Sequence, residues 1–210
     1  VEITEPEVLI VSEIHSNYMG YGVSCNGDSD GWIDISVIGG SGVYTYLWSN
    51  GAQTEDLFNI DPGIYSVLVT DENGCSDSIE IQITEPTALD IIEIYSDYNG
   101  YGVSCHGEAD GSIEVTVSGG DGDYSYNWIA LDSAYISTSE DIDNLFSGIY
   151  SLIVTDERGC VSNLYYELTQ PEPLEVNYSF NNSQCALDNG SIDITVLGGV
   201  SPYTYLWSNG

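Results

Sequence analysis

The stretch Val-Ser-Cys-Asn-Gly-Asp-Ser-Asp-Gly at residues 23–31 decides the fold, because the 210-residue chain repeats it. It returns as Val-Ser-Cys-His-Gly-Glu-Ala-Asp-Gly at 103–111 and, shortened, as Gln-Cys-Ala-Leu-Asp-Asn-Gly at 184–190. The cysteines of the three copies are spaced 80 residues apart: Cys25, Cys105 and Cys185. A fixed period of this kind indicates one folded unit copied in tandem.

The residues that follow each cysteine motif predict β-strands. Apolar and polar residues alternate there, as half-buried strands require: Ile33, Ile35 and Val37 in the first copy, Ile113, Val115 and Val117 in the second. The string Tyr-Thr-Tyr-Leu-Trp-Ser-Asn-Gly at 44–51 recurs unchanged at 203–210 and ends in Asn-Gly, a strong hairpin signal. Regular short strands without helical periodicity predict an all-β fold: tandem Ig-like β-sandwich repeats that form an extended rod.

Aromatic residues of these strands are predicted to fill the cores, because their alternation places them on one face of a sheet. They are Tyr44, Tyr46, Trp48, Tyr65, Tyr126, Trp128, Tyr150, Tyr205 and Trp207. The alternative is an exposed platform on which sugar rings stack. Buried rings would favour the core, and exposed rings would favour the sugar platform.

The repeats divide the chain into four predicted segments. Residues 1–6 are the end of a preceding repeat, 7–86 and 87–171 are complete repeats, and 172–210 is the first half of a third. The chain is therefore expected to be a window on a longer protein. The second repeat carries a hairpin insertion near 129–138, which either sets specificity or is a neutral change of loop length, the latter favoured because loops lengthen cheaply.

The charge of the chain restricts its partners. It has 34 acidic residues and one base, for a net charge of −33. Nucleic acids and anionic membranes attract positive charge, so neither is an expected partner. No apolar run approaches the ~20 residues of a membrane span, so direct membrane insertion is not expected either. Self-repulsion between like-charged repeats favours an extended chain.

The acidic turn motifs have two interpretations. Asp28, Asp30, Glu108 and Asp110 resemble the start of a calcium loop, but the further oxygen ligands and the closing glutamate of an EF-hand are missing. The element that all copies keep is Asp-Gly or Asn-Gly, which is typical of a turn that enters a strand. The turn is favoured over a calcium site, and no other cofactor is expected.

Five cysteines allow two disulfide registers in a repeated chain. The first pairs Cys25 with Cys75 and Cys105 with Cys160, and leaves Cys185 to a partner beyond the segment. The second links repeats, Cys75 to Cys105 and Cys160 to Cys185. The first is favoured, because four strands between Cys25 and Cys75 would return an up-and-down chain to the end where it started. Disulfides indicate an oxidising, extracellular setting.

The predicted strand count leaves the stacking of repeats unexplained. Copies that follow one another end to end need an odd number of strands, whereas the pattern gives six. A seventh strand is conceivable in 16–24, where Asn-Tyr-Met-Gly-Tyr-Gly at 17–22 recurs as Asp-Tyr-Asn-Gly-Tyr-Gly at 97–102.

The residue types needed for catalysis are scarce. The histidines are His15 and His106, and the one fixed cation is Arg158. No Cys-x-x-Cys spacing for a metal is present, and Cys105 is better placed in a disulfide than beside His106 as a nucleophile. The chain is not expected to be an enzyme.

The motifs of the first copy resemble the SprB repeat of Bacteroidetes surface proteins. The residues that carry the resemblance are Cys25, Gly27, Asp30, Gly31, Gly39, Gly40, Tyr44–Gly51, Gly63, Tyr65, Val67, Val69–Asp71, Gly74, Cys75 and Ile83–Pro86. The resemblance extends along essentially the whole chain. Departures are the insertion after Trp128, Ser147-Gly148 in place of Pro62-Gly63, and the shortened loop at Cys185.

The resemblance implies a non-catalytic stalk or adhesive segment of a very large adhesin, exported by the type 9 secretion system and displayed on the cell surface. Such adhesins serve attachment and gliding, and their partners are neighbouring repeats, extracellular polysaccharide or substratum. It also makes Ser78 and Ser133 candidates for O-glycosylation, because each is the central residue of an Asp-Ser-aliphatic tripeptide. Alternatives are a carbohydrate-binding array, using 129–138, 17–22 or 97–102, and a lateral subunit of an extracellular fibre or sheath.

Overall fold

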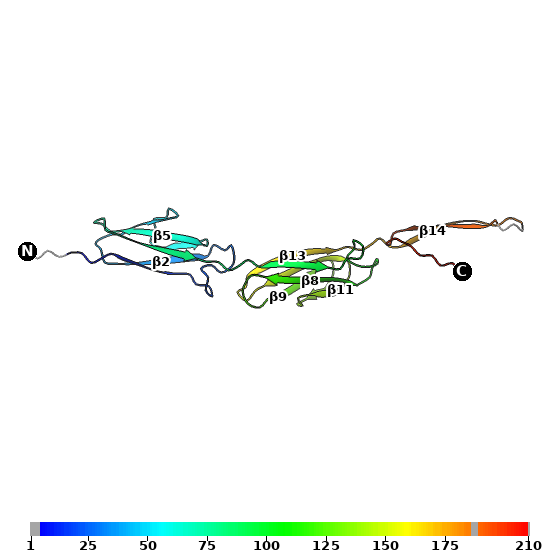
Figure 1. Cartoon of the computed structure of the whole chain (residues 1–210), viewed down its shortest axis with the longest axis horizontal. Helices are drawn as coiled ribbons and strands as arrows, with labels where there is room; N and C mark the ends of the chain where they lie inside the picture. The colour runs from blue at the N-terminus through cyan, green and yellow to red at the C-terminus, as the bar shows by residue number, and fades with distance from the viewer. Residues whose placement is uncertain (1–4, 186–188, 210) are drawn as a thin grey trace, which may run out of the picture. The chain divides into compact units, whose positions relative to one another are not determined.

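The computed structural model describes residues 5–185 and 189–209 (Figure 1). These residues form several small antiparallel sheets and no helix, which confirms the all-β prediction. None of them forms a helix long and apolar enough to cross a membrane. The chain comprises two compact units: 1–90 with 118–123 and 155–160, and 91–117 with 124–154 and 161–210.

The first repeat folds into two three-stranded sheets. One has the order β1-β2-β4 and the other the order β3-β5-β6. The strands are β1 (Ile10–His15), β2 (Gly31–Ile38), β3 (Thr45–Trp48), β4 (Leu57–Ile60), β5 (Gly63–Thr70) and β6 (Ser76–Ile83). Apolar side chains of both sheets meet in one core, with Ile33 of β2, Trp48 of β3 and Val67 of β5 almost fully buried. This arrangement is consistent with the expected Ig-like sandwich.

The second repeat has the same plan with one strand added. Its sheets have the orders β11-β8-β7 and β10-β9-β12-β13. The strands are β7 (Asp90–Tyr95), β8 (Gly111–Ser118), β9 (Ser125–Ala130), β10 (Ile136–Ser137), β11 (Ile142–Leu145), β12 (Gly148–Thr155) and β13 (Val161–Leu168). The added strand β10 pairs with β9 and lies in the predicted insertion. The core again centres on a tryptophan, Trp128, with an exposed fraction of zero.

The third copy contributes one two-stranded ladder, β14 (Glu175–Asn181) with β15 (Ser191–Leu197). The predicted core aromatics Tyr205 and Trp207 remain 55% and 45% exposed. The prediction is wrong for these two residues in this chain. In the first repeat β5 and its sheet cover the equivalent tryptophan, whereas the described part of the third copy has no such sheet.

Strand direction explains how repeats follow one another. β3 begins beside the end of β5, since Thr45 pairs with Thr70, and β4 ends beside the start of β2, since Ile60 pairs with Gly31. The two short strands therefore share one passage along the sandwich and change sheets midway. Six strands make five passages, an odd number. A seventh strand is not needed, and residues 16–24 contain only an isolated bridge, between Tyr18 and Tyr21.

The same geometry places two cysteines at opposite ends of the first repeat. At one end the backbone N–H of Cys75 donates to Asp71 Oδ1 at 2.8 Å. At the other, close to Cys25, the N–H of Gly27 donates to Glu85 Oε2 at 2.9 Å. Strand β6 runs between these ends, and eight extended residues span roughly 27 Å.

Candidate functional site: a cross-repeat cystine and the arginine beside it

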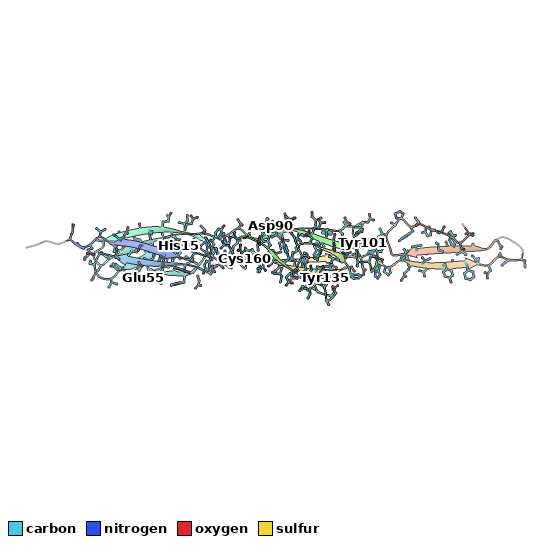
Figure 2. All side chains as sticks on the ribbon, turned by 90° about the horizontal axis from the view of Figure 1, so that it is seen from below. His15, Glu55, Asp90, Tyr101, Tyr135 and Cys160 are labelled. Atoms are coloured by element: carbon cyan, nitrogen blue, oxygen red, sulfur yellow. A yellow bond between two sulfur atoms is a disulfide. The ribbon has the colours of Figure 1, made fainter. Side chains whose placement is uncertain are left out.

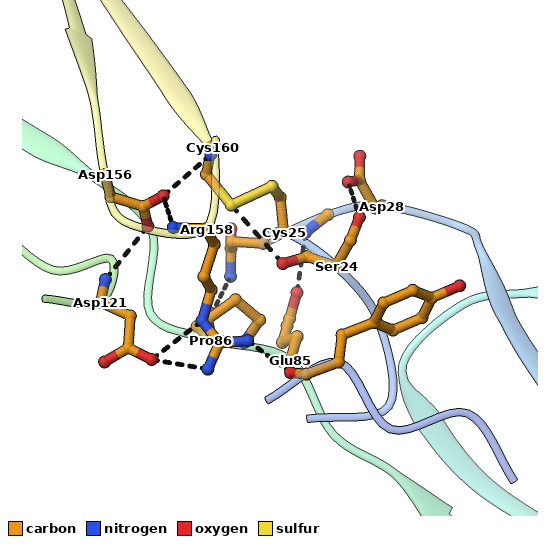
Figure 3. Close-up of a disulfide and its surroundings, with 12 residues drawn as sticks. Ser24, Cys25, Asp28, Glu85, Pro86, Asp121, Asp156, Arg158 and Cys160 are labelled. Carbon is orange, nitrogen blue, oxygen red and sulfur yellow. Dashed lines mark hydrogen bonds and ion pairs between the residues drawn. A yellow bond between two sulfur atoms is a disulfide. The ribbon is translucent and has the colours of Figure 1, made fainter. Parts of the chain in front are cut away.

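A disulfide joins the first cysteine of one repeat to the second cysteine of the next. Cys25 bonds to Cys160, with their Cα atoms 5.6 Å apart and 135 positions between them in the sequence (Figure 3). Both cysteines belong to the first compact unit, because 155–160 is part of it. The bond therefore ties the turn of the second repeat into the unit that contains the first.

Neither predicted disulfide register is present. The pairs Cys25 with Cys75 and Cys105 with Cys160 are wrong, and so is the alternative that pairs Cys75 with Cys105. The physical reason is the shared passage of β3 and β4, which leaves Cys25 and Cys75 at opposite ends of the sandwich. Cys75, Cys105 and Cys185 are unpaired and exposed.

Cys160 is held by a turn built around a buried carboxylate. Asp156 Oδ1 accepts the backbone N–H groups of Cys160 at 2.8 Å and Arg158 at 3.0 Å, and Oδ2 accepts that of Asp121 at 3.1 Å. The N–H of Asp156 donates in turn to the Cys160 carbonyl at 3.0 Å. Because three N–H groups converge on one side chain, the turn presents the cysteine in a fixed direction.

The first repeat has the same turn around Asp71. Burial alone would raise the pKa of this carboxyl, but backbone N–H groups of Cys75, Ser41 and Asn73 stabilise its charged form and hold its pKa below the usual value. The first turn therefore has the geometry needed to present Cys75 as the second presents Cys160.

Cys25 is held by a loop anchored to the end of its own repeat. Ser24 donates from its N–H to Asp30 Oδ1 at 3.0 Å and from its hydroxyl to Asp28 Oδ2 at 2.8 Å. Asn26 Nδ2 donates to the carbonyl of Pro86 at 3.0 Å. The joint between the two repeats, Thr84-Glu85-Pro86, is thus hydrogen-bonded to the loop that carries Cys25 (Figure 3).

Arg158, two residues before Cys160, supplies a second, ionic tie. Its guanidinium donates to Asp121 Oδ2 from Nη2 at 2.6 Å and from Nε at 2.9 Å. It also donates to the carbonyls of Tyr18, from Nη1, and Met19, from Nη2 at 2.9 Å. The ring of Tyr21 lies 4.7 Å from the guanidinium carbon, a cation–π contact. The arginine side chain is only 3% exposed, so these partners replace most of its water.

The segment 17–22 is shaped to offer those carbonyls. Tyr18 and Tyr21 exchange backbone hydrogen bonds, the Gly20 N–H donates to Asn17 Oδ1 at 2.7 Å, and Met19 has a left-handed φ of 50°. The Tyr18 carbonyl accepts the N–H of Tyr21, and the carbonyls of both Tyr18 and Met19 accept hydrogen bonds from Arg158. Arg158 thus contacts this segment through two backbone carbonyls and the Tyr21 ring, while the Met19 side chain stays exposed.

The two repeats differ in a matched pair of residues at this position. Where the second repeat has Arg158 with Asp121, the first has Asn73 with Ser41, and Asn73 Nδ2 donates to Ser41 Oγ at 2.5 Å. Both members of the neutral pair Asn73–Ser41 are thus exchanged together for the charged pair Arg158–Asp121. Arg158 is thus explained by the contacts of this junction and not by the turn itself.

We expect Arg158→Met to reduce the free energy of unfolding by about 1 to 3 kcal/mol, because it removes the donor to Asp121 Oδ2 and to the Met19 carbonyl. Arg158→Lys should restore little, since an ammonium lacks the planar fork that reaches several acceptors. Urea unfolding followed by circular dichroism measures the effect. Asn73→Ala, on the exposed equivalent turn, is the matched control and should change stability by less than about 0.5 kcal/mol; equal losses would contradict the role of Arg158.

The carboxylates considered as calcium ligands take part in turns. Asp30 and Asp110 accept the N–H groups of Ser24 and Ser104, each at 3.0 Å. Hydrogen bonds from the Ser104 hydroxyl and backbone lower the pKa of Asp110. Glu108 is exposed. Within 5–185 and 189–209 no three His, Cys, Asp or Glu side chains gather closely enough to hold a metal ion.

The core aromatics divide by depth. Trp48, Trp128 and Tyr150 are buried. Tyr44, Tyr46, Tyr65 and Tyr126 are half-buried and pack against the cores. Burial, and then a hydrogen bond to Glu55 (labelled in Figure 2), raise the pKa of Tyr46 to about 12. Burial, and then a hydrogen bond to Glu140, raise the pKa of Tyr126 to about 12. The four half-buried rings pack against the cores and keep part of their surface exposed to solvent.

The proposed glycosylation sites are accessible. Ser78 is exposed on β6, and Ser133 is exposed in the insertion. The insertion also exposes Leu131 and Ile136, while its base is anchored by the Trp128 indole N–H, which donates to the Ser139 carbonyl at 3.1 Å.

Each histidine contacts an acceptor of its own repeat. His15 Nδ1 is 2.8 Å from Glu13 Oε2, and His106 Nδ1 is 3.1 Å from the Pro171 carbonyl. The contact of His106 repeats that of Asn26 with Pro86, so it anchors a cysteine loop to a joint.

Comparison with known families agrees with this repeat structure. A family model described as the SprB repeat matches residues 23–53, 103–132 and 177–210. Each match includes the first cysteine of a copy and the alternating strand after it. No curated protein matches the chain. The matching family is one of structural repeats and not of enzymes, and it occurs in cell-surface proteins.

Proposed function

The chain carries three SprB repeats, a repeat found in Bacteroidetes gliding adhesins, and from this premise we propose that it is a structural and adhesive segment of a cell-surface adhesin that serves attachment and gliding. It is a cell-surface, adhesin-like repeat region. In this proposal the repeats act as a stalk, exported by type 9 secretion, and transmit force between the cell and the substratum.

The observation that carries the proposal is the Cys25–Cys160 bond. A segment that only separated two domains would need linkers, whereas here the turn of the second repeat is tied covalently to the first repeat. The Arg158 cluster adds a second, non-covalent tie between the same two segments. Both ties support a role in which the chain resists pulling.

A carbohydrate-binding array is the competing function. The surfaces considered for polysaccharide are the insertion at 129–138 and the segments 97–102 and 17–22, of which the last also bonds Arg158 through two backbone carbonyls. The experiment below separates the two, because a sugar-binding array acts through its ligand and not through movement.

Beads coated with Fab fragments against the 210-residue chain test the proposal on intact cells that make the protein. We expect the beads to bind and to be carried along the cell, and soluble Fab to reduce attachment of cells to glass. Fab pre-absorbed with the purified chain is the control. Absence of surface binding contradicts surface display. Binding without movement, together with adhesion that soluble polysaccharide abolishes, assigns the chain to carbohydrate binding instead.

A further inference from the structure

The covalent path through the chain is much shorter than the chain itself. A pull on the two ends passes from the N-terminus to Cys25, crosses the disulfide to Cys160 and continues to the C-terminus. The 135-position interval between the cysteines lies outside this path. It contains strands β2 to β12, which supply most of both hydrophobic cores.

We propose that the cross-repeat cystine is a tension shelter: it removes both cores from the path of a pulling force, so that their unfolding does not lengthen the chain. The proposal rests on the proposed function in one respect, that such a force acts on the protein in its setting. The shelter itself follows from connectivity and is a property of the purified chain.

The described strands left on the path are β1, β13 and the β14-β15 ladder, and each of them is a sheet edge. β1 is the outer strand of β1-β2-β4, and β13 is the outer strand of β10-β9-β12-β13. An edge strand can peel from one neighbour while the remaining strands keep their pairing. A pull on the N-terminus that peels β1 releases chain only as far as Cys25. A pull on the C-terminus that peels β13 releases chain only back to Cys160. The bond therefore limits how far either event can proceed.

The amount of hidden length distinguishes this register from the alternatives. An extended residue spans at most about 3.5 Å, so hiding 135 positions shortens the fully unfolded chain by about 470 Å. Two bonds within repeats would hide 50 and 55 positions, for a combined shortening of about 370 Å. Intra-repeat bonds would also leave the joint between repeats on the path, free to extend.

The second repeat offers the same attachment point to a following copy. Cys105 is exposed and unpaired, and Ser104 beside it donates to Asp110 as Ser24 donates to Asp30. A following repeat that presented a turn like that of Cys160 would meet the same loop. A cross-repeat bond of the same register can therefore form at the next junction.

Single-molecule stretching of the intact 210-residue chain, attached through its termini, tests the shelter. We expect the total contour length to be about 470 Å greater in dithiothreitol than without it. The reagent reduces the cystine to two thiols and is itself oxidised to a cyclic disulfide. The variant Cys25→Ser/Cys160→Ser should show the full length in both conditions, and Cys75→Ser/Cys105→Ser should keep the difference.

Two results overturn the proposal: equal contour lengths with and without reductant, or a difference near 370 Å that Cys75→Ser/Cys105→Ser removes. These measurements use purified chain and no cells. A failure here leaves the bead experiment untouched, and immobile beads on cells leave the contour lengths unchanged.

Discussion

Replacement of both linked cysteines, Cys25→Ser with Cys160→Ser, is expected to reduce the free energy of unfolding of the whole chain by about 3 to 5 kcal/mol. The bond closes a loop of 135 positions. In the chain-entropy model a loop of this length stabilises the folded state by about 5 kcal/mol, and measured values tend to be smaller than the model gives. Urea unfolding monitored by circular dichroism, with and without reductant, measures the loss; reductant should not destabilise the variant further.

The matched control is Cys75→Ser with Cys105→Ser, which removes two exposed, unpaired thiols and should leave stability within about 0.5 kcal/mol of the parent. Trypsin gives an independent check of the register, because Arg158 is the single basic residue in the sequence. In denatured, thiol-blocked Cys105→Ser, fragments 1–158 and 159–210 should stay joined until reduced. Fragments that separate without reductant would show that Cys160 is not bonded to Cys25.

The strands and the buried tryptophans could be predicted because they depend on local patterns. Ile33 and Ile35 alternate with polar residues, and the period of two is enough to place them in the core. Trp48 follows from the same rule. Tyr205 and Trp207 show its limit, since an identical sequence string is exposed where no second sheet covers it.

The cysteine pairing could not be predicted because it depends on which end of the sandwich each residue occupies. The Asn50-Gly51 hairpin signal predicts that the chain reverses after β3, but the next strand, β4 (Leu57–Ile60), continues the direction of β3. A reversal after β3 would place Cys75 at the same end of the sandwich as Cys25, and for that reason the sequence favours the Cys25–Cys75 bond, which is not present. The observed register, from Cys25 to Cys160, passes over the nearer cysteines and was not among the alternatives.

A signal for this junction was nevertheless present in the sequence. The equivalent turns read Asp-Glu-Asn-Gly-Cys at 71–75 and Asp-Glu-Arg-Gly-Cys at 156–160, so the single base of an acidic chain stands two residues before a cysteine. Asp121 replaces Ser41 in the same repeat. A charged pair that appears together in one copy indicates a contact specific to that copy, but its other partners are backbone carbonyls of Tyr18 and Met19, which a sequence pattern does not reveal.

Trp128→Ala is expected to destabilise the second compact unit by about 3 to 5 kcal/mol. The side chain is fully buried in the core of the second repeat, and truncation leaves a large cavity among residues that can only partly relax. It also removes the indole N–H that donates to the carbonyls of Ser139 at 3.1 Å and Glu140 at 3.2 Å. Urea unfolding followed by circular dichroism measures the loss, and Trp128→Phe, which keeps much of the volume, should recover part of it.

Trp207→Ala provides a control with the same residue type in the same repeated motif. Its side chain is 45% exposed, so truncation creates no closed cavity and should cost less than about 1 kcal/mol. A large difference between the two variants shows that burial, and not the aromatic motif, determines the contribution of the tryptophan. Comparable losses would mean that Trp207 is covered in solution, and the third copy would then bury an aromatic core without a β5-type strand.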